Sequence, residues 1–213
     1  MVALVVSVVV VVVCSSLLGR VEQVPAWEGR AFGSINRLPD GVRLAVVPVM
    51  QAGAVLAIAA VALLFVFINR RRTAVAVVAA GYGAYLIARF AKLLFGRARP
   101  GELLAEITLR DEVSGLGFPS GHAAVSMALV VVVLPHLSGR WRWGLLAIPL
   151  LVGFARVYVG AHLPLDVVAG WAIGVFAASG VHLILGVPSR ARNGEKIVAE
   201  PSPRTQVFLR REG

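Results

Sequence analysis

The sequence predicts an all-α fold, an integral membrane bundle of six transmembrane helices. Hydrophobic residues make up 58% of the 213 residues and the mean hydropathy is +0.83, well above the apolar share of about 45–50% in soluble domains. Six apolar stretches approach the length of about 20 residues with which a helix crosses a bilayer. They cover residues 2–18, 44–68, 74–95, 122–137, 143–159 and 164–186.

Residues 1–186 are therefore expected to form one transmembrane domain. The first stretch, MVALVVSVVVVVVCSSLLG, lacks a basic start and a clear small-residue cleavage site, which favours a retained span over a removed signal peptide. The linker 19–43 mixes acidic and basic residues and carries Trp27 and Phe32, a composition typical of a helix on the membrane surface. Residues 187–213 are basic and poor in apolar side chains, so we expect a disordered cytoplasmic tail.

Short basic linkers predict the orientation of the spans, because Lys and Arg concentrate on the cytoplasmic side. The segments NRRRT (69–73) and SGRWRW (138–143) are strongly basic, as is the tail. With six spans, these segments and both termini share one side, which we expect to be the cytoplasmic side of the plasma membrane. The linkers 19–43, 96–121 and 159–164 then lie on the outer side.

The charge distribution and the cysteine content argue against nucleic-acid binding and against sites that need several cysteines. The net charge is +10, but the basic residues cluster between apolar stretches and form no stripe with aromatic residues, so no nucleic-acid partner is expected. Cys14 is the single cysteine, which excludes an internal disulfide and a multi-cysteine metal site. The expected partners are membrane lipids, and the sequence leaves the oligomeric state open.

Three polar clusters flank the predicted spans, and all of them fall on the outer side. They are KLLFGRARP (92–100), PSGH (119–122) and ARVYVGAHLPLD (155–166). An Arg or Lys within a span costs at least about 2.5 kcal/mol, so ionisable residues beside spans are retained for a purpose. Because all three clusters lie on the same side of the membrane, they indicate one site assembled from three parts of the chain.

Residues from all three clusters together have the chemistry of an anion site. Arg99 and Arg156 offer planar forks that bind phosphate oxygens in pairs, and Lys92 adds a point charge. Ser120 and Gly121 open the fourth predicted span, where free backbone N–H groups and the helix dipole favour an anion. These five residues are the predicted phosphate-binding groups.

The third cluster adds a nucleophile. Asp166 lies four residues after His162, and Pro164 between them suits the first position of a helix. Asp166 on the first turn can therefore reach back and orient the imidazole of His162, as the acid of a catalytic triad does. We expect His162 to be the nucleophile and His122 the general acid for the leaving oxygen.

Other charged residues near these clusters have two interpretations each. Arg89 lies three residues before Lys92 and is either a second contact to the substrate, such as the distal group of a pyrophosphate, or the partner of a polar group between helices. Arg97 either binds phosphate or faces solvent, and we favour solvent. The acidic residues of 102–112 form a solvated face or a movable lid.

The motifs together resemble the three-part signature of the type 2 phosphatidic acid phosphatase superfamily. The pattern is Lys92, six residues, then Arg99-Pro100; Pro119-Ser120-Gly121-His122; and Arg156, five residues, His162, three residues, Asp166. Ala155 departs from it, because the family often has serine before the arginine. The related vanadium haloperoxidases are generally soluble and longer, which disfavours that activity.

The resemblance implies a phosphatase that needs no metal or cofactor and works through a phosphohistidine on His162, with His122 as the acid. A lipid phosphate or pyrophosphate is the expected substrate, and an undecaprenyl or decaprenyl pyrophosphate is our first choice. Phosphatidic acid or phosphatidylglycerol phosphate is the alternative. A non-catalytic lipid-binding or transport protein is an alternative of another class, although binding alone would not require His122, His162 and Asp166.

Overall fold

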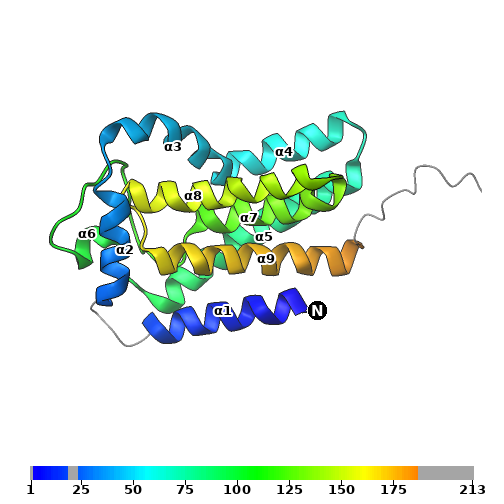
Figure 1. Ribbon diagram of the computed structural model, residues 1–213. Helices are drawn as coiled ribbons and strands as arrows, with labels where there is room; N and C mark the ends of the chain where they lie inside the picture. Colours follow the sequence, from blue (N-terminus) through cyan, green and yellow to red (C-terminus); the bar gives the residue numbers. More distant parts are fainter. Residues whose placement is uncertain (1, 19–23, 187–213) are drawn as a thin grey trace, which may run out of the picture.

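The computed structural model describes residues 2–18 and 24–186, and every regular element in these ranges is helical (Figure 1). The α-helices are α1 (Val2–Leu18), α2 (Ala26–Asn36), α3 (Arg43–Met50), α4 (Val55–Phe67), α5 (Arg71–Phe95), α6 (Pro100–Leu103), α7 (Gly121–Val133), α8 (Ala147–Tyr158) and α9 (Pro164–Leu185). Four 3-10 turns lie between them: η1 (Asp40–Val42), η2 (Gln51–Gly53), η3 (Leu134–His136) and η4 (Arg140–Leu146). The predicted tail, 187–213, lies outside the described residues.

Helix α7 lies inside the bundle, where it packs against α9 and α5 and also contacts α8 and α4. Helix α1 packs on α9, and α3 packs on α8. In Figure 1 the axes of α1, α8 and α9 are nearly parallel, whereas α2 lies across one end of the bundle, where α6 is also found. The first linker thus contains a helix, α2, which lies at one end of the bundle, and its position on the membrane surface stays a prediction.

The helix lengths bear on the predicted number of spans. By length and composition, Arg71–Leu103 and Pro164–Leu185 can cross a membrane, and Asp40–Gly53 with Val55–Phe67 is a third span if this pair, bent by 67°, is counted as one. The apolar segment Gly121–His136 is shorter. These helices agree with an integral membrane protein. In the described ranges, two or three of them are long and apolar enough to span a membrane, so the number six stays a prediction.

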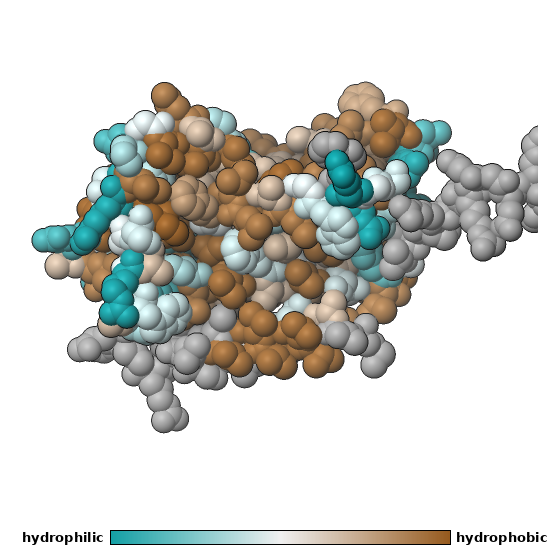
Figure 2. Space-filling view, in the orientation of Figure 1, coloured by the Kyte–Doolittle hydropathy of each residue, from teal (hydrophilic) through white to brown (hydrophobic). Residues whose placement is uncertain are grey.

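The outer surface of the bundle is strongly apolar. Leu56, Phe67, Leu94 and Ile184 are each at least 80% exposed. Figure 2 shows a broad hydrophobic region over the middle of the molecule and hydrophilic residues gathered toward both ends. Such extensive apolar exposure is unusual in a soluble monomer and is expected where lipid replaces water around the helices.

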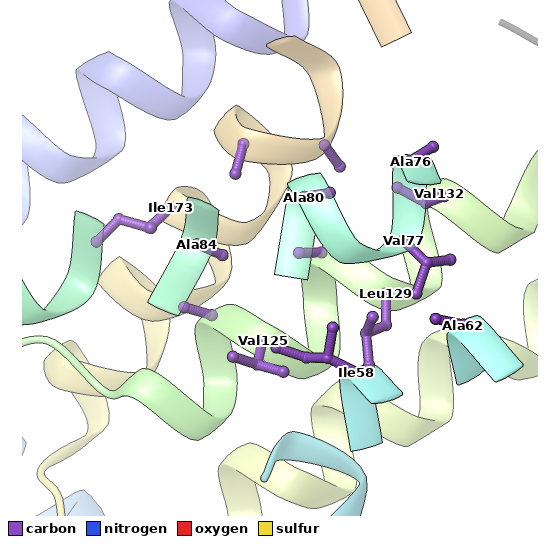
Figure 3. Packing of buried hydrophobic residues seen from close by; sticks show 14 of the residues in the cluster. Ile58, Ala62, Ala76, Val77, Ala80, Ala84, Val125, Leu129, Val132 and Ile173 are labelled. Carbon is purple, nitrogen blue, oxygen red and sulfur yellow. The ribbon is translucent and has the colours of Figure 1, made fainter. Parts of the chain in front are cut away.

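Small side chains let the inner helices approach closely. Ala80 and Ala84 of α5 and Ile58 of α4 are fully buried in the main core cluster (Figure 3). On α9, a Cβ atom added to Gly170 would lie 2.5 Å from the carbonyl oxygen of Ser120. Gly170 and Gly174 in the segment GWAIG have the spacing of small residues that allows close helix packing, and here they let α7 lie directly against α9.

Candidate active site

The start of α7 is anchored to the start of α9. Ser120 is the N-cap of α7, and its backbone N–H donates to the carbonyl oxygen of Asp166 at 2.9 Å. The hydroxyl oxygen of Ser120 is buried and has no hydrogen-bond partner among the described residues. Because the first backbone N–H groups of a helix lack intrahelical acceptors, Gly121 and His122 bring further unused donors to this end of α7. The PSGH segment therefore offers the polar groups expected of an anion cradle.

His162 lies in the linker between α8 and α9, where only 2% of it is exposed. Its backbone N–H donates to the carbonyl oxygen of Arg156 at 3.2 Å. Its Nδ1 atom lies 3.4 Å from Oδ2 of Asp166, close to the carboxylate but without a hydrogen bond. The same Oδ2 accepts a hydrogen bond at 2.9 Å from the N–H of Leu163. Asp166 thus reaches back from the first turn of α9 to the residues before the helix, as its spacing from His162 predicted.

The surroundings of His162 keep its imidazole neutral. Burial lowers the pKa of His162 well below its usual value, and the positive charges of Arg156, Lys92 and Arg99 lower it further. A neutral imidazole has a free lone pair, which a nucleophile requires. With Nδ1 directed at Asp166, Nε2 is the nitrogen left for reaction.

Lys92, at the end of α5, binds backbone oxygens of the linker that leads to α7. Its Nζ donates to the carbonyl oxygens of Leu116 and Gly117 at 2.5 and 2.9 Å. A Cβ atom on Gly117 would lie 2.7 Å from the carbonyl oxygen of Ala98, so only glycine fits this close crossing of the two linkers. The ammonium group therefore sits at the crossing, beside the PSGH segment.

Arg99 binds the same linker and the linker after α8. Its Nε and Nη2 atoms donate to the carbonyl oxygens of Ser114 and Gly115 at 2.7–3.2 Å. Its Nη1 atom donates to the carbonyl oxygen of Ala161 at 2.9 Å, one residue before His162. Partial burial lowers the pKa of Arg99, but an arginine stays charged in proteins.

Arg156, near the end of α8, is the most buried of the three predicted phosphate-binding cations. Its Nη1 atom donates to Oδ2 of Asp111 at 3.1 Å and contacts the sulfur of Met50 at 3.3 Å. Its Nε atom is buried without a hydrogen-bond partner among the described residues. A buried donor without an acceptor costs about 1–3 kcal/mol, which a bound phosphate oxygen would recover.

Arg97 corrects a prediction. The expectation that it faces solvent is wrong, because its side chain is only 9% exposed and binds two carboxylates. Its Nη1 atom lies 2.8 Å from Oδ1 of Asp166, and its Nη2 atom lies 2.7 Å from Oε2 of Glu28. Burial alone would lower the pKa of Arg97, but its hydrogen bonds and ion pairs with Glu28 and Asp166 raise it above the usual value.

Glu28 is the residue of this group that sequence reasoning missed. It lies on α2 and is fully buried, like Phe32 and Asn36 at the following positions of the same helix face. That spacing of four residues is the signal that could have found it, because it places Glu28 in line with Phe32 toward the bundle. Trp27 is 49% exposed and Phe32 is 1% exposed, so of these two aromatic residues only Trp27 is free to contact lipid.

The remaining predicted residues lie at the edge of the cluster or away from it. Arg89 is exposed on α5, and its Nη1 atom donates to the hydroxyl of Tyr85 at 3.2 Å. Of the acidic residues in 102–112, Asp111 binds Arg156, whereas the others are exposed: Glu102, Glu106 and Glu112. Within the described ranges, no group of three or more His, Cys, Asp and Glu side chains could hold a metal ion.

The chain is similar in sequence to known phosphatases. The chain is 35% identical over 115 residues to an undecaprenyl-diphosphatase of Sulfolobus acidocaldarius, a match that covers 53% of this chain and 55% of the relative. It is 32% identical over 126 residues to the decaprenylphosphoryl-5-phosphoribose phosphatase of Mycobacterium tuberculosis, covering 58% of this chain and 68% of that protein. The first of these matches thus spans about half of the relative's length.

Solved structures share the fold. The Aquifex aeolicus LpxE structure has a TM-score of 0.69 and 23% identity, covering 74% of this chain and 95% of that one. A transmembrane PAP2 type phosphatidylglycerolphosphate phosphatase of Bacillus subtilis has a TM-score of 0.68 and 19% identity, covering 90% of this chain and all of that one. The sequence model of the PAP2 superfamily matches residues 72–188, more than half of the sequence and all three polar clusters. The chain belongs to the PAP2 superfamily.

Proposed function

We propose that this protein is a membrane lipid phosphatase that transfers a phosphoryl group to His162 and then to water, without a metal ion. The observation that carries the proposal is the position of His162, whose Nδ1 atom lies 3.4 Å from a buried carboxylate oxygen of Asp166. Its imidazole interacts electrostatically with Arg156, Lys92, Arg99 and His122. A neutral nucleophile among fixed cations is suited to attack a phosphate.

The first step forms a covalent intermediate. Nε2 of His162 attacks phosphorus, the bond from phosphorus to the leaving oxygen breaks, and His122 donates a proton to that oxygen. Asp166 stabilises the positive charge that develops on the imidazole, in the role that the acid of a catalytic triad has. Lys92, Arg99 and Arg156 stabilise the charge on the phosphoryl oxygens, and Ser120 and Gly121 hold them at the start of α7.

The second step returns the enzyme to its starting state. A water molecule attacks the phosphorus of the phosphohistidine and gives its proton to His122, which is now the base. The nitrogen–phosphorus bond breaks, His162 is neutral again, and inorganic phosphate leaves. The two steps together consume one water and leave both histidines in their initial protonation states.

The substrate is proposed to be a polyprenyl pyrophosphate whose tail lies in the bilayer. A cavity of about 510 Å³ supports a lipid tail. It begins near Ser126, one turn after His122 on α7, and extends between α4, α7 and α8 to Arg70 and His136. The names of the undecaprenyl and decaprenyl relatives favour a polyprenyl chain, whereas the structural likeness to a phosphatidylglycerolphosphate phosphatase keeps glycerophospholipid phosphates as the second candidate.

The proposed topology has six spans, with the active site at the outer face of the plasma membrane and both termini in the cytoplasm. The basic segments 69–73 and 138–143 support this orientation. A cysteine placed in 69–73 should resist a membrane-impermeant thiol reagent in whole cells and react after lysis. Labelling of that cysteine in intact cells would invert the topology.

Phosphate release by the purified protein in detergent tests the function. We expect turnover of polyprenyl pyrophosphates in excess chelator, with lower kcat/KM for phosphatidic acid and phosphatidylglycerol phosphate. Turnover that requires an added divalent cation would contradict the metal-free mechanism. A protein that binds these lipids but releases no phosphate from any of them would instead be the non-catalytic lipid-binding or transport protein.

A further inference from the structure

A fully buried carboxylate from α2 reaches the proposed catalytic residues, and the mechanism so far gives it no role. Glu28 is 0% exposed and accepts three hydrogen bonds. Its Oε2 accepts from Nη2 of Arg97 at 2.7 Å, and its Oε1 accepts from Nη1 of Arg97 at 3.3 Å and from the N–H of Leu165 at 3.0 Å. Glu28 therefore holds both Arg97 and the first turn of α9.

The same guanidinium also binds Asp166. Nη1 of Arg97 donates to Oδ1 of Asp166 at 2.8 Å, while Oδ2 accepts from Leu163 and faces His162. Both oxygens of Asp166 are thus held, and Oδ2 is the one nearest to Nδ1 of the imidazole. Since removing one partner of a buried ion pair is strongly destabilising, this geometry strongly favours one orientation of the Asp166 carboxylate.

The summed charge of Glu28, Arg97 and Asp166 determines how well this group stabilises positive charge on His162. Asp166 alone with Arg97 would be a neutral pair, whose field at the imidazole would be small. Glu28 adds a second negative charge paired with the same Arg97, so the three groups together carry a net charge of minus one in their ordinary ionised forms. Asp166 can then be held by an arginine and still stabilise positive charge on His162.

We propose that Glu28 and Arg97 are positioning residues for the phosphoryl transfer: Arg97 orients Asp166 toward His162, and Glu28 holds Arg97 and preserves the net negative charge of the group. The proposal rests on the proposed function, because it assigns these residues to the nucleophile of that reaction. It also gives α2 a role beyond the membrane surface, since this helix completes the support of His162 from outside the residues that the PAP2 sequence model matches.

Two substitutions test the two parts of the proposal. Glu28→Gln keeps the size of the side chain and one acceptor oxygen but removes the charge, and Arg97 stays paired with Asp166. Arg97→Lys keeps the positive charge but cannot bind two carboxylates with a planar fork. We expect each to lower kcat by about tenfold or more, because a small misplacement of a reacting group can cost about a hundredfold in rate. KM should change by less than about twofold, because neither residue touches the substrate.

The pH dependence of kcat/KM distinguishes this proposed role from a purely structural one. A residue that only stabilises the fold would not shift the acid limb, the fall of kcat/KM at low pH. The charged or titratable groups around His162 are those of Lys92, Arg99, His122, Arg156 and Asp166. Glu28→Gln leaves all five in place but removes negative charge behind Asp166, so the imidazolium of His162 becomes less favourable. The acid limb should therefore move to lower pH in Glu28→Gln, and it should not move in the control Glu106→Gln, which changes an exposed carboxylate.

The outcomes separate the proposal from the proposed function. A wild-type protein that releases no phosphate from any lipid phosphate overturns the proposed function and this inference with it. An active wild type whose Glu28→Gln and Arg97→Lys variants keep the wild-type kcat and acid limb overturns this inference alone, and so does a change confined to KM. If Glu28→Gln cannot be isolated as a folded protein, the kcat and KM of Arg97→Lys decide by the same criteria.

Discussion

Arg97 and Arg99 are two residues apart in the linker after α5, yet their guanidinium groups have different kinds of partner. Arg97 binds two fully buried carboxylates, those of Glu28 and Asp166. Among the described residues, Arg99 hydrogen-bonds only neutral carbonyl oxygens, which belong to the linker before α7 and the linker after α8. A phosphate that displaced the partners of Arg97 would leave two buried charges unpaired, whereas one that displaced those of Arg99 would replace neutral acceptors with a charged one.

The difference divides the cluster into two regions. In the region around Arg97 and the first turn of α9, the arginine is already paired with the carboxylates of Glu28 and Asp166. This region is therefore suited to supporting His162 rather than to binding the substrate. The region of Lys92, Arg99 and Arg156 is held by carbonyl oxygens and by Asp111, whose side chain is 37% exposed. This second region is the one that can exchange its present partners for the oxygens of a substrate.

The largest effect is expected where the two regions meet, at His162. The substitution His162→Ala removes the nucleophile and should lower kcat by about 10⁴-fold or more, the scale seen when a catalytic triad loses its nucleophile. Phosphate release and the thermal stability of the purified variant should be measured together. A folded His162→Ala variant with substantial activity would remove His162 from the reaction.

A matched pair of substitutions sharpens the comparison itself. Arg99→Lys should lower kcat/KM by about 10²–10³-fold, because a point charge replaces a fork that binds two phosphoryl oxygens. Part of that loss should be a rise in KM, whereas Arg97→Lys should change kcat and leave KM nearly constant. Steady-state kinetics of the two variants with one substrate distinguish them. Identical changes in both variants would show that the division into two regions is wrong.

A smaller effect is expected from Asp111, the carboxylate that now binds Arg156. Asp111→Asn removes a negative charge that competes with the substrate for the buried Arg156. Because the side chain of Asp111 itself is 37% exposed, KM should fall by only a few-fold. Inhibition by orthovanadate, a phosphate analogue, should strengthen by a similar factor. Weaker inhibition in this variant would indicate that Asp111 supports the site.

The smallest effect concerns pH. Because burial and nearby cations lower the pKa of His162, the free enzyme should keep a neutral nucleophile below the usual histidine pKa of about 6.5. The acid limb of kcat/KM, which reports groups of the free enzyme, should therefore lie below that pH. An acid limb above it would mean that His162 is protonated in the free enzyme at neutral pH.

Much of the candidate site could be predicted because its chemistry is local in sequence. His162, Pro164 and Asp166 lie within one linker and one helical turn, so their spacing alone brings the carboxylate beside the imidazole. The contacts of Arg97 could not be predicted in this way. Its two partners, Glu28 and Asp166, are each 69 residues away in the chain, and only the packing of α2 across the ends of the helices brings them together.

The fold shows the same limit. The uniform apolar composition of 44–68 predicts one span, but the chain breaks at Ala54, whose extended backbone separates η2 from α4. Next to this break, a side chain on Gly53 would collide with the backbone of His122. The bend depends on a contact with α7 that hydropathy does not encode, whereas the all-helical class follows directly from the length and composition of the apolar stretches.

Trapping the covalent intermediate tests the central claim most directly. The wild-type protein should be mixed with a radiolabelled lipid phosphate in excess chelator, quenched in strong base and analysed for protein-bound label. We predict a phosphoenzyme that is stable in base, labile in acid, as a phosphohistidine is, and absent from His162→Ala. An active wild type whose protein-bound label is acid-stable, or persists in His162→Ala, would contradict the phosphohistidine on His162.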